Sequence, residues 1–374
     1  MINWKFLRNI IIKACVLFLL ANLIFIVLAP VEELGRISAY NVLFPGRNRF
    51  PFGEDHQNAH NLSLYNVNAM FASHEIHAVE KPDHEYRIIV VGDSSVWGTL
   101  LRPEETLAGQ LEMIGGEVCD GGDVRVYNLG YPTMSLFKDL MIIDEAVKYQ
   151  PDLVIWLVTL ESFPTQGQLS SPIIANNPDI VRRLIHEYDL SFDAEDPALV
   201  ILDSLDRTII GQRRALADLA RLQLYGFLWA ATGVDQVYPQ DYQPAQRDFD
   251  ADYSFHDLLP PSLPDNALAF ELLTAGAQAI GDIPFLIVNE PILVSTGENS
   301  DIRYNFYYPR WAYDSYRSQL QEEAVDAGWN YLDVWDLVPE NEFTNSAVHL
   351  TPKGVEQLTS RVIKTIENLI CGAR

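Results

Sequence analysis

Short apolar segments and amphipathic segments alternate along two parts of the chain, and this alternation constrains the fold more than any other feature. Strands are predicted at 87–91, 124–128, 153–158, 285–288 and 331–334. Helices are predicted at 103–114, 136–149, 267–280, 311–327 and 352–370. Because strands that alternate with helices form parallel sheets, we expect a doubly wound α/β domain of about five strands with helices on both faces.

The alternation lapses between the third and fourth strands. Residues 162–265 contain polar loops, one predicted helix at 208–232 and a stretch rich in Pro, Asp and Gln at 238–264. We interpret this segment as a large, mostly helical insertion. Its helix ends in the very apolar run 222–231, which favours packing on the core, with a lid or a surface resting on the outer membrane leaflet as the alternatives.

The amino terminus carries a membrane signal. The run 10–29 is apolar except for Lys13 and Asn22, and roughly 20 such residues are enough to cross a bilayer. Basic residues precede this run and acidic residues follow it, so residues 1–30 are predicted to be a cytoplasmic stub and a single transmembrane anchor. The main domain is then extracytoplasmic, on the cell membrane. A cleaved signal peptide is the alternative, but no small-x-small site is present and Pro30 follows the best cut.

Charge and cysteine content exclude some classes of protein. The 374 residues include 26 basic and 51 acidic side chains, a net charge of -25, which argues against a nucleic-acid partner. The three cysteines, Cys15, Cys119 and Cys371, form neither a disulfide framework nor a spaced metal set. One bridge between Cys119 and Cys371 stays possible.

Residues 31–85 have no sustained hydrophobic period and are interpreted as a juxtamembrane connector that packs along the domain. Five of the eight histidines lie in it. Because no helical pattern aligns them and no HExxH motif is present, we expect solvated loop histidines and no metal site. The five are His56, His60, His74, His77 and His84.

The first strand ends abruptly in the stretch YRIIVVGDSSVWG, at 86–98. A hydroxyl at the carboxyl end of such a strand lies where parallel sheets present ligands, and Gly92 permits a sharp turn there. Ser94 is therefore a candidate nucleophile. The alternative is a strand-to-helix turn in which Asp93 and the serines are caps.

A histidine follows the last predicted strand. His349 lies between that strand and the last helix, again at the carboxyl edge of the sheet. A serine hydroxyl is a weak nucleophile and needs an adjacent base, so His349 is the candidate general base for Ser94. The alternative is a histidine near a helix start that is satisfied by a backbone group.

Three sequence blocks together resemble the SGNH (GDSL-type) hydrolases. They are Gly92-Asp93-Ser94, Asn128-Leu129-Gly130 and the block at 349–354, and the resemblance covers two core halves, 86–161 and 266–374. It implies the flavodoxin-like SGNH hydrolase fold, with Ser94 as nucleophile and His349 as base. It also implies an oxyanion hole that includes the backbone N–H groups of Ser94 and Gly130.

The chain departs from that family at three positions. Thr133 stands where the family usually has an oxyanion glycine, and its backbone N–H could still serve as an oxyanion donor. Leu160 stands where the family has an oxyanion asparagine. The loss of one such donor typically costs about two to three orders of magnitude in rate. Ser346 replaces the aspartate that usually lies three residues before the histidine. Three other residues remain as possible partners of the histidine: Glu161, Glu290 and Asn345.

Two hypotheses follow from these residues. The first is a membrane-anchored, extracytoplasmic serine esterase or O-acyltransferase that acts on acyl groups of a cell-envelope glycan or lipid without a cofactor. The second is a catalytically degenerate domain that binds a glycan or a multi-span membrane acyltransferase. The anchored, outward-facing arrangement also resembles accessory proteins of membrane acyltransferase systems. A dinucleotide-binding protein is disfavoured because no GxGxxG follows the first strand.

Overall fold

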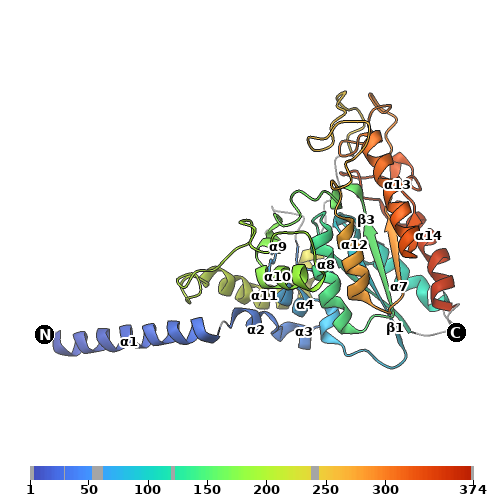
Figure 1. Ribbon diagram of the computed structural model, residues 1–374. Coiled ribbons are helices and arrows are strands. Elements are labelled where there is room, and N and C mark those ends of the chain that lie inside the picture. The colour runs from blue at the N-terminus through green and yellow to red at the C-terminus, as the bar shows by residue number, and fades with distance from the viewer. Residues whose placement is uncertain (1–3, 29, 53–61, 119–122, 237–243, 372–374) are drawn as a thin grey trace.

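A five-stranded sheet forms the centre of the molecule (Figure 1). The computed structural model describes residues 4–28, 30–52, 62–118, 123–236 and 244–371. All strand pairs are parallel, in the order β2-β1-β3-β4-β5. This order confirms the expected doubly wound, flavodoxin-like α/β sheet. The strands are β1 (Glu85–Gly92), β2 (Asp123–Gly130), β3 (Leu153–Val158), β4 (Phe285–Asn289) and β5 (Asn330–Asp333).

Helices cover both faces of the sheet because successive strand residues point to opposite sides. Ile88 and Val90 of β1 pack with α7 (Leu107–Val118) and α14 (Pro352–Cys371) in one apolar cluster. Ile89 and Val91 pack in the second cluster, on the other face. The long helices on that face are α8 (Leu136–Ala146), α12 (Phe270–Ile280) and α13 (Arg310–Ala327).

Several short helical elements were not predicted as separate elements, and two of them lie inside the predicted helices 103–114 and 136–149. Elements of three to ten residues span too few turns to show a helical period. In the connector these are α2 (Val31–Gly35), α3 (Ala39–Leu43), α4 (Val67–Ser73) and α5 (Glu75–Ala78). Elsewhere they are α6 (Ser94–Trp97), α9 (Pro172–Ala175), α10 (Pro178–Glu187) and the 3-10 turns η1 (Pro103–Glu105), η2 (Val147–Tyr149), η3 (Leu160–Ser162), η4 (Val234–Gln236) and η5 (Glu340–Glu342).

The connector is bound tightly to the core. Arg49 is buried, and its Nη1 donates to the carbonyl oxygens of Trp97 (3.2 Å), Gly98 (2.8 Å) and Leu101 (3.1 Å). These carbonyls lie at and just after the end of α6, where helical carbonyls have no intrahelical partner. A side chain from the connector therefore completes the hydrogen bonding of the helix that follows β1.

The expectation of solvated histidines in the connector is wrong for His74. Its ring is buried, its Nε2 lies 3.1 and 3.0 Å from the carbonyl oxygens of Asn48 and Asn128, and its Nδ1 accepts the Ile76 N–H. Burial lowers the pKa of His74 to about 4, so the ring is neutral at pH 7. His77 contacts the Tyr149 hydroxyl at the surface, while His56 and His60 lie outside the described residues.

Helix α1 (Trp4–Leu28) projects from the domain with almost all of its side chains exposed (Figure 1). It is long and apolar enough to cross a membrane. Helix α11 (Arg213–Thr232) begins five residues later than predicted and packs against the connector helices α2, α3 and α4. Gly226 of α11 is required at this contact, since a Cβ there would lie 2.2 Å from the Tyr40 ring.

The possible Cys119–Cys371 bridge cannot be placed, because Cys119 and the side chain of Cys371 lie outside the described residues. Cys15, in α1, is an exposed free thiol.

Candidate active site

Ser94 is the first residue of α6, two residues after the end of β1. The strand order changes direction between β1 and β3, so the serine lies at the switch point where doubly wound sheets bind ligands. The Asp93 carboxylate caps the turn by accepting the Ser95 N–H at 2.8 Å. Gly92 allows the close turn, since a Cβ there would lie 2.6 Å from Val96 Cγ2.

The end of β2 holds α6 in place. The Asn128 side-chain amide donates to the Val96 carbonyl oxygen at 2.7 Å, and its Oδ1 accepts the Gly130 N–H at 3.0 Å. Gly130 lies so close to α6 that a Cβ would come within 2.3 Å of the Trp97 nitrogen. This block of the resemblance therefore has a direct structural role: it fixes the segment that carries Ser94.

The structure brings the two ends of the chain's core together at this edge. His349 Nε2 lies 2.8 Å from Ser94 Oγ, although 255 positions separate the two residues. Burial lowers the pKa of His349 to about 4, so its imidazole is neutral at pH 7 and free to accept a proton. The separation is a normal hydrogen-bond length between a nucleophile and its base.

The third member of the constellation is an amide. Asn345 Oδ1 lies 2.8 Å from His349 Nδ1. An amide oxygen only accepts, so Nδ1 carries the ring proton and Nε2 is left to accept the proton of Ser94. Asn345 thus sets the tautomer that a general base requires, but it supplies no negative charge to stabilise an imidazolium. Asn345 is exposed, and Ser346 beside it is buried.

Glu161, the first of the two carboxylates considered as partners of His349, binds a different histidine. It lies just after β3, and its oxygens are 3.1 and 3.2 Å from Nε2 of His256. Burial raises the pKa of Glu161, and His256 opposes this shift. His256 belongs to the predicted insertion, so that segment reaches the edge of the sheet at which β3 ends.

Glu290, the second carboxylate, binds Ser95. Its side chain is 2% exposed and its Oε2 accepts the Ser95 hydroxyl, whereas its Oε1 has no hydrogen-bond partner among the described residues. Burial, reinforced by the nearby charge of Asp93, raises the pKa of Glu290 well above its usual range. Glu290 is therefore a buried acid next to the turn that carries Ser94, and it does not contact His349.

A buried lysine lies among these acids. Lys138 of α8 is 0% exposed, and its Nζ lies 2.5 Å from Asp139 Oδ1 while donating to the carbonyl oxygens of Gly92 (2.7 Å) and Tyr131 (3.3 Å). It therefore ties the turn before Ser94 to the end of β2. Burial raises the pKa of Asp139 to about 6 and also raises that of Asp93. We call Asp93, Lys138, Asp139 and Glu290 the buried charge cluster.

Sequence reasoning missed Lys138 and Arg49 as parts of the site. The available signal for Lys138 was the pair Lys138-Asp139 within the apolar run of α8, where an amphipathic helix would place apolar residues. No comparable signal marks Arg49, because its contacts form only in the folded chain.

Two of the three predicted oxyanion donors already have hydrogen-bond partners in the structure. The Gly130 N–H donates to Asn128 Oδ1, and the Thr133 N–H donates to the Tyr131 carbonyl oxygen at 2.6 Å. Leu160, at the position of the family's asparagine, is an apolar side chain buried in the core. A substrate oxyanion would therefore have to displace an internal hydrogen bond to use either N–H group.

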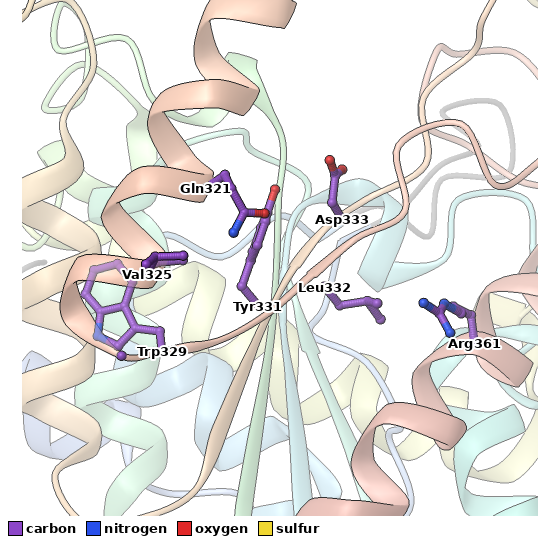
Figure 2. A pocket seen from close by; sticks show the side chains of 9 residues that line it. Gln321, Val325, Trp329, Tyr331, Leu332, Asp333 and Arg361 are labelled. Atoms are coloured by element: carbon purple, nitrogen blue, oxygen red, sulfur yellow. The ribbon is translucent and has the colours of Figure 1, made fainter.

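A shallow pocket lies elsewhere, at the open edge of the sheet (Figure 2). Side chains from α13, β5 and α14 line it, and Tyr331, Asp333 and Arg361 are among them. Strand β5 is three places away from β1 in the sheet, so this pocket does not contain Ser94 or His349. Among the described residues, no group of three or more potential ligands is placed to hold a metal ion.

In comparisons with known proteins, this chain is similar to solved structures only. No family model matches the sequence, and no curated protein matches it. A carbohydrate acetylesterase family member from Sinorhizobium meliloti is 12% identical with a TM-score of 0.35, over 76% of this chain and 99% of that chain. An acetylxylan esterase variant from Geobacillus stearothermophilus is 12% identical with a TM-score of 0.33, over 75% and 94%.

A third similar structure is a family two carbohydrate esterase from Clostridium thermocellum, 8% identical with a TM-score of 0.33, over 76% of this chain and 64% of that chain. All of these scores are low. The geometry of Ser94 and His349 is therefore the stronger indication of function.

Proposed function

We propose that this chain is a membrane-anchored, extracytoplasmic serine esterase or O-acyltransferase that acts on acyl groups of a cell-envelope glycan or lipid. The observation that carries the proposal is the 2.8 Å contact between Ser94 Oγ and His349 Nε2, with Nδ1 held by Asn345. A serine, a neutral histidine and a residue that orients the histidine form the constellation of nucleophilic acyl transfer.

In the proposed mechanism, His349 removes the Ser94 proton as Ser94 Oγ attacks the carbonyl carbon of an ester. The tetrahedral intermediate collapses to an acyl-Ser94 ester, and His349 gives its proton to the leaving alcohol. Water or a sugar hydroxyl then attacks the acyl-enzyme, with His349 again as base, and Ser94 is regenerated. The N–H of Ser94, with those of Gly130 and Thr133 once their internal bonds open, would stabilise the oxyanion.

The membrane part of the proposal rests on α1. The positive charges before this helix and the acidic residues after it favour a cytoplasmic amino terminus and an external main domain. An external, anchored esterase would meet acylated glycans or lipids of the envelope, and a multi-span membrane acyltransferase is a proposed partner. The net charge of -25 disfavours a nucleic-acid partner.

Fluorophosphonate labelling of the full-length protein in detergent tests the activated serine. We expect a label that maps to Ser94, is lost in Ser94→Ala and falls by about two to four orders of magnitude in rate in His349→Ala. Ser170→Ala, at an exposed serine outside the site, is the matched control and should label like the unchanged protein.

A second function is favoured by the positions at which the site departs from the pattern of SGNH hydrolases. Leu160 replaces a donor, Asn345 is neutral, and the Gly130 and Thr133 N–H groups have internal partners. A degenerate domain that binds a glycan or a membrane acyltransferase without turnover would have these properties. A well-folded protein that fails to label at Ser94 would contradict the enzyme and support the binding domain.

A further inference from the structure

Residues 200–210, which we call the tip segment, expose several large apolar side chains. Leu205 is 76% exposed. The tip segment extends beyond α11 toward α1, in yellow-green in Figure 1. Scattered exposed apolar residues are normal, but a cluster of them marks an interaction surface. The exposed members are Val200, Ile201, Leu202, Leu205 and Ile210.

The tip segment is bonded to the apolar helix at the amino terminus. Asn22 Oδ1 accepts the Ile209 N–H at 3.0 Å, and Asn22 Nδ2 donates to the Phe18 carbonyl oxygen at 2.8 Å. Asn22 is the one buried residue among those described in α1. A polar side chain in a membrane span is costly unless its hydrogen bonds are satisfied, and this contact satisfies both ends of the amide.

The contact between Asn22 and Ile209 also fixes the depth of the tip segment relative to the membrane. Asn22 lies six residues before the last residue of α1, which at 1.5 Å per residue is about 9 Å along the helix axis. Interfacial segments bury their apolar side chains by roughly 5–10 Å. If α1 crosses the bilayer, the tip segment therefore lies at the level of the outer leaflet and not above it.

Much of the backbone of the tip segment meets the requirement that a lipid environment imposes. Asp203 Oδ1 accepts the N–H groups of Leu205 (2.7 Å) and Asp206 (2.8 Å), and the Thr208 N–H and Arg207 N–H bond to carbonyl oxygens within the segment. Non-helical backbone at membrane depth is tolerated only where such groups have partners. Several backbone N–H groups of the tip segment are thus satisfied within its own turns.

The balance of acidic and basic residues near the tip segment differs from that of the whole chain. Residues 200–232 contain four arginines and three aspartates, whereas the whole chain carries 51 acidic and 26 basic residues. Arginines at the boundary of an apolar surface bind lipid phosphates, and an acidic surface would be repelled by an anionic leaflet. This local balance favours a phospholipid surface as the occupant.

We infer that the tip segment inserts into the outer leaflet beside α1, with phospholipid acyl chains covering its apolar side chains and headgroup phosphates contacting the nearby arginines. This inference rests on the proposed membrane anchoring by α1. With two attachment points, the domain keeps a fixed orientation above the bilayer, which one anchor joined by a free linker would not impose.

Depth measurements on spin-labelled full-length protein test this inference. Single cysteines replace Leu205 or Ile210 in the tip segment, Leu17 in α1, and Val325 on α13, in a variant whose native cysteines are serine. The protein is placed in bilayers of equal amounts of phosphatidylcholine and phosphatidylglycerol. Val325 is the matched control, because it is an apolar residue 67% exposed on a helix remote from α1 (Figure 1).

We expect nitroxides at positions 17, 205 and 210 to collide with oxygen more than with a water-soluble nickel chelate, by a several-fold higher ratio than at position 325. A lipid-like ratio at position 17 with a water-like ratio at 205 and 210 would overturn this inference and leave the anchor intact. A water-like ratio at position 17 would overturn both. Two tip positions keep the test valid where one variant fails to fold.

Discussion

The two sides of the Ser94–His349 pair are supported in opposite ways. The turn that carries Ser94 is held from below by buried polar groups: Lys138 binds the Gly92 carbonyl oxygen and Glu290 binds Ser95. His349 is oriented by one exposed neutral amide, that of Asn345. The position of the proposed nucleophile therefore depends on the fold as a whole, whereas the orientation of the proposed base depends on a single replaceable contact.

Because of this difference, substitutions on one side should change the stability of the fold, and substitutions on the other should change the reactivity of Ser94. Changes in the buried charge cluster should act first on folding, because unpaired charges in the interior are costly. Changes at Asn345 should act on the reactivity of Ser94 with little effect on folding, because the side chain is at the surface. Four predictions, given in order of decreasing effect, test this separation.

Replacement of the buried lysine should have the largest effect. Lys138→Met leaves the carboxyl groups of Asp93, Asp139 and Glu290 without their buried cation and should lower the free energy of unfolding by about 3–5 kcal/mol. Because these carboxyls can protonate, the loss should be smaller at pH 5 than at pH 8. Denaturant unfolding followed by tryptophan fluorescence measures the free energy of unfolding at each pH.

Lys148→Met, at an exposed pair with Glu145, is the control and should lower the free energy of unfolding by under about 1 kcal/mol. A loss no larger than this control would show that the cluster is not structural.

Changes at Asn345 should alter the labelling rate of Ser94. Asn345→Ala removes the acceptor for His349 Nδ1–H and should slow fluorophosphonate labelling by about tenfold to hundredfold, part of the full general-base contribution. Asn345→Asp supplies a carboxylate that stabilises the imidazolium, so labelling should become faster than in the unchanged protein. Asn176→Ala, at an exposed asparagine outside the site, is the control. Equal rates in all four proteins would mean that Asn345 does not orient the base.

The pH dependence of labelling should show the unusual pKa of His349. The reactive form is the neutral imidazole, so the rate should rise through pH 4 and then stay level to neutral pH, because burial lowers the pKa of His349 to about 4. An unperturbed histidine would place this rise near pH 6.5. Asn345→Asp should move the rise to higher pH. A rise near 6.5 in the unchanged protein would show that the base is solvated.

Replacement of Glu290 should have the smallest effect. Its pKa is raised well above the usual range, so the carboxyl is neutral at moderate pH and Glu290→Gln preserves its shape and hydrogen bonding. We expect a change in the free energy of unfolding within about 1 kcal/mol at pH 5. Since the folded pKa exceeds the unfolded one, the unchanged protein should lose stability as pH rises above about 4.5, and the variant should lose less. A large loss in the variant at pH 5 would indicate an ionised Glu290 paired in the folded state.

Particular residues show how far the sequence allowed prediction of the site. The contact between Ser94 and His349 follows from two strand ends at one edge of a parallel sheet. The choice among Glu161, Glu290 and Asn345 could not be made, because all three follow strands at that edge and only packing decides which one reaches His349. Glu161 turned out to face His256, which comes from a segment with no regular pattern.

Local sequence was enough to predict the sheet, its long helices and the edge at which the reactive groups lie. The reason is that hydrophobic periodicity is local, and each long element shows its buried face within its own residues. The burial of Lys138, the capping of α6 by Arg49, the neutral state of His74 and the contact between Asn22 and Ile209 emerged only in the folded chain. Those features depend on pairs far apart in the sequence, and the partner sets the desolvation and hydrogen bonding that give each side chain its properties.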